Sequence, residues 1–233
     1  MTSANPYGFP PVHRRGEGTT RIDERAVRWG GSDREDDPVA LLLHGLGSHE
    51  EDLAGLVPAL PGNIRWAALR GVFTCGAGYA WLQPPPVEGT GTELLEESAR
   101  ALEDWIAQHV PGGRVSGVIG FSQGAMLALQ LLRRDPQAMD WVVQLSGAPF
   151  PVEQPGDAAL AARRPPALWG HGGQDPLVDP VREVAVRSWM QAHTDLTEVR
   201  SEALGHGIDE TVLEATVRFV ADRRAEREGR DRS

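Results

Sequence analysis

Residues 115–134 read VSGVIGFSQGAMLALQLLRR and join an apolar run to a helical pattern through the pentapeptide GFSQG. The run 115–120 has the continuous apolar character of a strand that is buried on both faces. A serine between two glycines at such a junction is expected on a sharp turn, with its hydroxyl at the carboxyl edge of a sheet. The stretch therefore predicts a strand–turn–helix unit with Ser122 as a candidate nucleophile. A chance match in a glycine-rich chain is the alternative.

Short apolar runs and helical patterns alternate along the chain on both sides of Ser122. This alternation is typical of an α/β protein with a mostly parallel central sheet and helices on both faces. A more polar run at 25–29 is expected to form an antiparallel edge strand. No repeat or long linker divides the chain, so we predict a single domain. Further strands are expected at 39–43, 64–69, 141–146, 167–170 and 197–201, and helices at 51–60, 92–109, 180–192 and 209–224.

The two ends of the chain differ in composition from its middle. Residues 1–20 are rich in proline, glycine and charge, which predicts a flexible N-terminal arm. Residues 225–233 are polar and are expected to form a tail, which leaves 21–224 as the domain. Residues 71–91 contain glycines, aromatics and three consecutive prolines, and they are expected to form a long loop.

The charged residues of this 233-residue chain exclude several classes of function. Its net charge is −10, and all 23 of its basic residues other than histidine are arginines. A chain without lysine has no Schiff-base lysine and no phosphate-binding P-loop lysine. An acidic balance also argues against a nucleic-acid partner. We interpret the missing lysine as a bias of lineage rather than of function, with adaptation to salt as the weaker alternative.

The cysteine count and the hydropathy pattern bear on the compartment. Cys75 is the sole cysteine, so the chain has no internal disulfide and no multi-cysteine metal site, and no metal is expected. The N-terminal segment lacks the apolar run of a signal peptide, and no stretch approaches the length of a membrane span. We therefore expect a cytoplasmic protein without stable membrane association.

A serine nucleophile needs a base, and the base needs an orienting acid, in the chain order Ser, Asp or Glu, His. Asp175 follows the apolar run 167–170 and is the candidate acid, although a turn-forming role before a proline is the alternative; Asp179 and Asp157 are rivals. His206 lies between glycines, after the last expected strand and before the last helix. It is the candidate base, since the other six histidines fit this order less well.

Donors for an oxyanion are expected next to the nucleophile. The backbone N–H of Gln123 opens the helix after Ser122, where the helix dipole favours negative charge. A second donor is expected in the loop after the strand 39–43, where Leu46 is the candidate. The alternative is that Gly45 and Gly47 only form a tight turn, and both interpretations are compatible.

Six motifs in order along residues 39–220 resemble the phospholipase/carboxylesterase family of α/β-hydrolases, which includes acyl-protein thioesterases and bacterial carboxylesterases. The resemblance implies the α/β-hydrolase fold, a catalytic triad of Ser122, Asp175 and His206 with Leu46 and Gln123 as oxyanion donors, and hydrolysis of esters or thioesters without a cofactor. The chain departs from the family pattern at Leu82, where an aromatic residue is usual, and this leaves the substrate open. The motifs are LLLHGLGSHEEDL, Arg70-Gly71 with Ala80-Trp81, GFSQGA, LSG, HGGQDPLV and GHGI.

An acyl chain requires an apolar groove beside Ser122. We expect a shallow groove for short to medium acyl chains of small-molecule esters, with thioesters or lysophospholipids as further substrates. A lactone or dienelactone hydrolase and a non-catalytic ligand-binding homologue are the alternative functions. The sequence is compatible with a monomer or a homodimer. The groove is expected to be lined by Phe73, Trp81, Phe150, Leu177 and Ile208.

Overall fold

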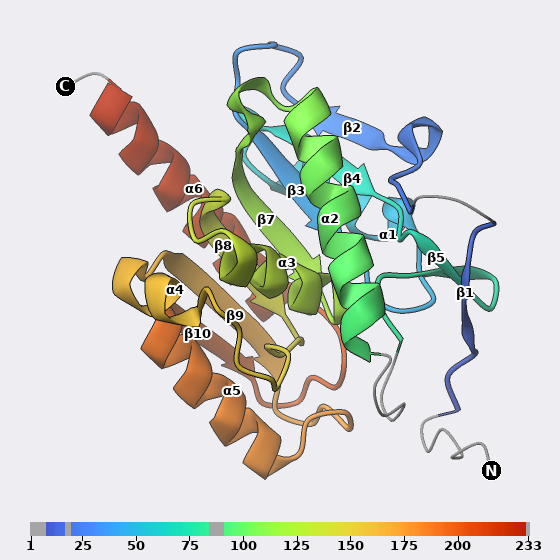
Figure 1. Ribbon diagram of the computed structural model, residues 1–233. Helices are drawn as coiled ribbons and strands as arrows, with labels where there is room; N and C mark the ends of the chain where they lie inside the picture. Colours follow the sequence, from blue (N-terminus) through green and yellow to red (C-terminus); the bar gives the residue numbers. More distant parts are fainter. Residues whose placement is uncertain (1–7, 17–19, 84–90, 232–233) are drawn as a thin grey trace.

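A seven-stranded sheet forms the centre of the computed structural model, which describes residues 8–16, 20–83 and 91–231 (Figure 1). The six strands in the order β10-β9-β8-β7-β3-β4 are parallel, and β2 pairs antiparallel with β4 at one edge. The expected α/β class, the mostly parallel sheet and its antiparallel edge strand are confirmed. The strands are β2 (Arg28–Gly31), β3 (Val39–Leu43), β4 (Arg65–Leu69), β7 (Val115–Phe121), β8 (Met139–Leu145), β9 (Pro166–Gly172) and β10 (Asp195–Ser201).

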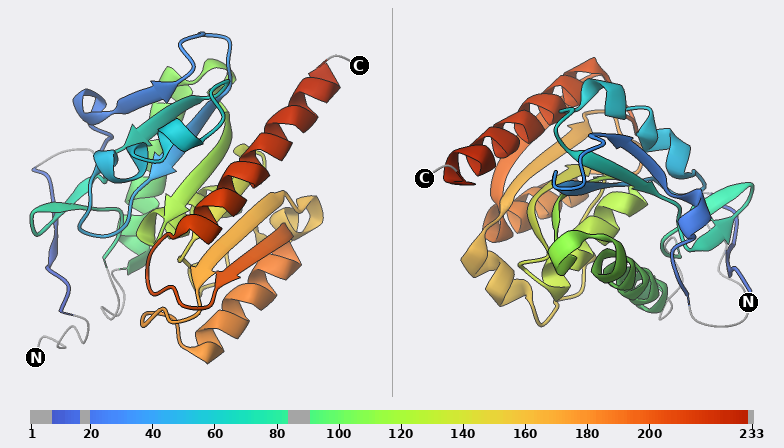
Figure 2. Two further views of the ribbon diagram at one scale, coloured as in Figure 1. Left: turned by 180° about the vertical axis from the view of Figure 1, so that it is seen from behind. Right: turned by 90° about the horizontal axis from the view of Figure 1, so that it is seen from above.

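Helices cover both faces of this sheet (Figure 2). Successive residues of a strand point to opposite faces. In β3, Leu41 and Leu43 accordingly belong to one apolar cluster, whereas Ala40 and Leu42 belong to the other. The first cluster is shared with α2, α3, α4 and α5, and the second with α1 and α6. The helices are α1 (Glu50–Ala54), α2 (Gly91–His109), α3 (Gln123–Arg134), α4 (Asp157–Arg163), α5 (Pro180–His193) and α6 (Glu210–Asp231), with short 3-10 turns at η1 (Glu24–Ala26), η2 (Val57–Ala59) and η3 (Pro111–Gly113).

Two helices differ from the pattern expected from sequence. The helix expected at 51–60 divides into α1 and η2, because Pro58 lacks an N–H and its ring disfavours a continuous helix. The short helix α4 was not predicted, since its seven residues span only two turns. No helix among residues 8–16, 20–83 and 91–231 combines the length and the apolar character needed to cross a bilayer.

A second, three-stranded sheet lies beside the central one, at the right of Figure 1. Its strands are β1 (Val12–Arg14), β5 (Phe73–Cys75) and β6 (Gly78–Ala80), paired antiparallel in the order β1-β5-β6. The expectation of a flexible arm is therefore wrong for residues 12–14, which pair with a hairpin. The expected loop 71–91 begins with that hairpin, while its prolines lie outside the described residues.

The polar tail expected at 225–233 is wrong for most of its length, because α6 continues to Asp231. Polar contacts hold its last turns against the rest of the domain. Asn63 donates to Glu228 at 2.8 Å, and Arg227 lies 3.1 Å from Asp140 at the start of β8. The pattern of apolar residues ends near 220 because these turns pack through charged side chains.

Candidate active site

Ser122 occupies a strained turn between β7 and α3. Its backbone angles, φ 53° and ψ −112°, lie in a region that residues with a side chain rarely adopt. The turn is tight because α3 returns directly over the neighbouring strand. A Cβ on Gly124 would lie 1.9 Å from the carbonyl oxygen of Leu43, so only glycine fits there. The GFSQG segment thus projects the Ser122 side chain from the carboxyl edge of the sheet.

A continuous hydrogen-bonded chain joins Ser122, His206 and Asp175. Nε2 of His206 lies 3.0 Å from Oγ of Ser122, and Nδ1 lies 2.7 Å from Oδ2 of Asp175. Asp175 follows β9 and His206 lies between β10 and α6, so both loops leave the same edge of the sheet as Ser122. Because Asp175 accepts through Oδ2, the imidazole donates from Nδ1 and presents its Nε2 lone pair to the serine hydroxyl.

The environment of Asp175 keeps this buried carboxyl ionised. Burial opposes the charged form, but the hydrogen bond from His206 and the backbone N–H of Leu177, 2.9 Å from Oδ1, outweigh it. The pKa of Asp175 is accordingly lowered from its usual value. A carboxylate that stays charged is able to orient the imidazole and to stabilise it when protonated.

The two rival acids have structural partners elsewhere. Asp179 caps the N-terminus of α5 and accepts a 2.8 Å hydrogen bond from the backbone N–H of Arg182. Asp157 forms a bidentate ion pair with the buried guanidinium of Arg133, with both contacts at 2.6 Å. Of the three aspartates considered, Asp175 is the one in contact with His206.

The candidate oxyanion donors lie on the same pocket as Ser122 and His206, which Leu46 and Gln123 both line. Gln123 is the first residue of α3, where backbone N–H groups have no partner within the helix. Its side chain fixes the neighbouring loop, since Oε1 accepts from the N–H of Trp81 and Nε2 donates to the carbonyl of Leu82. The loop of Leu46 is held by the N–H of Gly47, which donates to Tyr79 at 2.8 Å.

His44 anchors the loop that carries Leu46. Its Nδ1 lies 2.7 Å from the carbonyl oxygen of Gly45, and its Nε2 accepts from the N–H of Gly71 at 2.9 Å. The indole of Trp81 donates to the His44 carbonyl at 2.9 Å. Burial disfavours the charged imidazole and lowers the pKa of His44 to about 4. His44 is therefore neutral and has both ring nitrogens engaged at pH 7.

The stability of the protein is expected to fall on acidification because of His44. The unfolded chain binds a proton at His44 below its ordinary pKa of 6.5, whereas the folded state resists protonation down to about 4. The stabilising contribution is complete above pH 6.5 and is lost as the pH falls towards 4. In urea unfolding, the free energy of unfolding falls between pH 7.0 and pH 4.5, and we expect this fall to be about 2–3 kcal/mol smaller in His44→Gln than in wild type. An equal fall in His44→Gln and in wild type would contradict this prediction. His13→Gln, which changes an exposed histidine, serves as the control and is expected to behave like wild type.

The pocket above Ser122 has a volume of about 370 Å³ and is mainly apolar. Of the five expected lining residues, Leu177 lines it. The expectation is corrected for the other four, Phe73, Trp81, Phe150 and Ile208, which belong to or pack against the apolar clusters and do not line the pocket. The residues that sequence reasoning missed include Phe9, Leu82, Phe121, Met126, Ala148 and Val178.

Phe9 is separated in sequence from all the other residues that line the pocket, the next of which is Gly45. It precedes β1, which pairs with β5 and brings the arm to the mouth of the pocket. The thiol of Cys75 contacts the carbonyl of Pro10 at 3.5 Å and adds to this attachment. Phe9 and Tyr7 are the aromatic residues of this arm. Their type is the only available signal, because the position of Phe9 depends on a strand pairing that the sequence does not reveal.

A model of the phospholipase/carboxylesterase family matches residues 89–223, which is more than half of the chain. The chain belongs to this family. Its members share the α/β-hydrolase fold found here, and membership makes the protein a hydrolase that acts on ester bonds. The motif GFSQGA at the junction of β7 and α3, and the two separate loops that carry Asp175 and His206, all lie in the matched region.

Individual relatives and solved structures agree with the family assignment. Esterase YpfH of Escherichia coli K12 is 24% identical over 189 residues, which cover 76% of this chain and 79% of the relative. The carboxylesterase of Bacillus cereus superposes with a TM-score of 0.72 at 19% identity, covering 84% of this chain and 93% of that one. Acyl-protein thioesterase 2 of Zea mays gives a TM-score of 0.69 at 19% identity, covering 84% and 98%.

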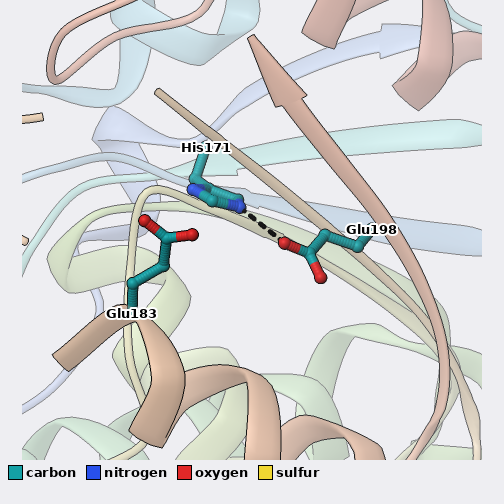
Figure 3. A group of neighbouring side chains, drawn as sticks. All are labelled: His171, Glu183 and Glu198. Carbon is teal, nitrogen blue, oxygen red and sulfur yellow. Dashed lines mark hydrogen bonds and ion pairs between the residues drawn. The ribbon is translucent and has the colours of Figure 1, made fainter. Parts of the chain in front are cut away.

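One cluster in this family member has the composition of a metal site. His171, Glu183 and Glu198 extend from β9, α5 and β10, and each offers a ligand atom within 4.8 Å of the others (Figure 3). His171 Nε2 faces Glu198 at 3.0 Å. Arg187 donates to both carboxylates, at 2.8 Å to Glu183 and at 2.6 Å to Glu198. The positive charge between the carboxylates is therefore supplied by a guanidinium, and the cluster is an ion-pair network.

Proposed function

We propose that this protein is a serine hydrolase that cleaves carboxylic esters of short to medium acyl chains through Ser122, His206 and Asp175. The observation that carries the proposal is the hydrogen-bonded chain of these three side chains, of which Ser122 and His206 line an apolar pocket. A hydroxyl is a weak nucleophile, and a neutral imidazole oriented by a carboxylate is the usual way to activate it.

In the acylation step, Oγ of Ser122 attacks the ester carbonyl as His206 Nε2, 3.0 Å away, accepts the hydroxyl proton. The backbone N–H groups of Leu46 and Gln123 stabilise the negative charge that forms on the carbonyl oxygen. Each such donor is typically worth about 3–4 kcal/mol of transition-state stabilisation. The bond to the alcohol oxygen then breaks, and His206 returns its proton to the leaving group.

The acyl group that stays on Ser122 is removed by water. His206 takes a proton from the water molecule, and the resulting hydroxide attacks the acyl carbonyl against the same two donors. When the bond to Oγ breaks, His206 returns the proton to Ser122, and the acid is released. No step requires a cofactor, and thioesters follow the same sequence with a thiol as leaving group.

The dimensions of the pocket support a small acyl substrate. A volume of about 370 Å³ lies near the lower end of the range for small-molecule pockets, about 300–1,000 Å³. Leu82, Met126 and Ala148 give its walls an apolar character, and Ser48 and Asp52 make one margin polar. We infer an acyl chain against the apolar walls, with a small-molecule ester or thioester as the partner.

A panel of p-nitrophenyl esters from acetyl to palmitoyl, together with the matching thioesters, tests the proposal. We expect hydrolysis of the esters with the highest kcat/KM between about butyryl and octanoyl. Failure to hydrolyse any member of the panel would overturn the proposed activity. A clear preference for palmitoyl over butyryl would keep the activity but reject the small pocket as the acyl site.

The N-terminal arm is expected to set the chain-length preference through Phe9. Phe9→Ala removes one apolar wall of the pocket, so short chains lose contact and longer chains gain space. We expect a drop of about tenfold in kcat/KM for butyryl esters and an optimum at longer chains. His13→Ala changes an exposed residue of the same arm outside the pocket and serves as control. An identical chain-length profile in Phe9→Ala would refute the role of the arm.

A further inference from the structure

A second cavity, of about 210 Å³, lies at the end of the central sheet opposite to Ser122. Ser116, Asp140 and Pro166, at the starts of β7, β8 and β9, contribute to its walls, together with the last turns of α6. Figure 2 shows α6 running diagonally across the sheet towards the C-terminus. The seven residues of β7 separate the cavity from the catalytic edge, a length of roughly 20 Å.

Arginines dominate the lining of this cavity. Five of them, Arg163, Arg223, Arg224, Arg227 and Arg230, line it together with two carboxylates. The chain as a whole carries a net charge of −10, so such a gathering of positive charge is a local departure from its composition. Four of the arginines lie on α6 and the fifth at the end of α4, so the tertiary fold brings them together.

Carboxylates accompany several of these guanidinium groups. The two carboxylates of the lining are Asp140, which is shared by Arg227 and Arg114, and Glu226, which pairs with Arg223 at 2.7 Å. Outside the lining, Arg224 lies 3.1 Å from Glu228 and 3.8 Å from Asp37.

Two guanidinium groups of the cluster have donors that no carboxylate accepts among the described residues. Arg163 donates to the backbone carbonyls of Pro136 and Met139 rather than to a carboxylate. Burial and the nearby charge of Arg114 lower the pKa of Arg163, and the charges of Asp140 and Asp135 offset this only in part. Within the described part of the chain, Nε of Arg223 is buried and has no hydrogen-bond acceptor.

We propose that this cavity binds a small oxyanion with two or more negative charges, of the phosphate or carboxylate type. Guanidinium groups match such oxyanions because their planar forks donate two parallel hydrogen bonds. Ile64, Trp141 and Pro166 add apolar surface to the lining, which suits an anion carried on a small carbon skeleton. The bound anion would connect α6 and α4 to the starts of β8 and β9, and it would therefore stabilise this end of the domain.

Thermal unfolding at constant ionic strength tests the proposal, with inorganic pyrophosphate and citrate as probes and sodium chloride as reference. A ligand at one hundred times its Kd is expected to raise Tm by about 5–10 °C in a chain of this size. Pyrophosphate and citrate distinguish the phosphate from the carboxylate type, and saturation by either supports the site. A rise no larger than that in the chloride reference would overturn it and assign the arginines to helix ends and ion pairs alone.

Variants locate the effect without reference to catalysis. The double variant R223Q/R227Q is expected to lose the anion-dependent rise in Tm, whereas R218Q, an exposed arginine of α6 outside the cavity, is expected to keep it. Should the double variant fail to fold, hydrogen exchange of the wild type provides the second readout. Slower exchange in the last turns of α6 on addition of the saturating anion supports the site. Unchanged exchange there, or a rise in Tm that survives in the double variant, would overturn it.

Discussion

Ser122→Ala is expected to reduce kcat on p-nitrophenyl butyrate by about 10³- to 10⁶-fold while the protein stays folded. The change removes the only oxygen within hydrogen-bond distance of His206 Nε2 among the described contacts of that atom. Alanine has the same backbone restrictions as serine, so the strained turn at φ 53° is kept and Tm should change little. Residual activity is expected from the oxyanion donors and the pocket alone.

Covalent labelling by a fluorophosphonate probe provides a second measurement for the same variant. The probe reacts with an activated serine, so wild type is expected to be labelled on the peptide that contains Ser122, and Ser122→Ala is expected to be unlabelled. Ser48 lines the same pocket and donates to Asp52 at 2.7 Å, which makes Ser48→Ala the matched control. Full esterase activity in Ser122→Ala, or equal labelling of wild type and Ser122→Ala, would exclude Ser122 as the nucleophile.

Asp175→Asn is expected to lower kcat by about 10⁴-fold with little effect on the fold. The asparagine side chain has nearly the same shape, but its amide is able to donate to Nδ1 and so favours the wrong imidazole tautomer. The loss of the carboxylate also removes the charge that stabilises protonated His206, 2.7 Å away in the wild type. The expected loss is therefore in kcat, with a KM that changes much less.

Asp179→Asn is the matched control for this substitution. Asp179 caps α5 four residues further along the chain, and asparagine is an equally good capping residue. Steady-state kinetics and thermal unfolding of both variants separate the two roles. A large loss of kcat in Asp179→Asn with near wild-type activity in Asp175→Asn would assign the acid to the rival residue.

The residues that line the pocket differ from those expected from local patterns. Leu177 was placed beside the candidate acid by its position in the loop, and it lines the pocket. Phe73 and Trp81 were expected there because they are aromatic residues of a supposed loop, but both are fully buried in the core. Large apolar side chains fill the core and line pockets for the same physical reason, so residue type alone does not separate the two.

The arm and the long loop were misjudged for a related reason. Each of β1, β5 and β6 has three residues, too few for periodicity to show. The strands β5 and β6 pair as a local hairpin, whereas β1 pairs with β5 across some 60 positions of the chain, as in the register of Val12 with Cys75. The formation of so short a strand depends on the strand it pairs with as much as on its own residues.

The sequence by itself determined the class of the fold, the family and the order of the candidate triad. These follow from local features: buried strands of five to seven residues read as continuous apolar runs, and the glycines around Ser122 are required by a turn made within a few residues. Only the tertiary structure decided that His206 contacts Asp175, that Phe9 lines the pocket, and that five arginines share one cavity. Those contacts join residues from different elements, and their distances depend on how a whole sheet and its helices pack rather than on any local pattern.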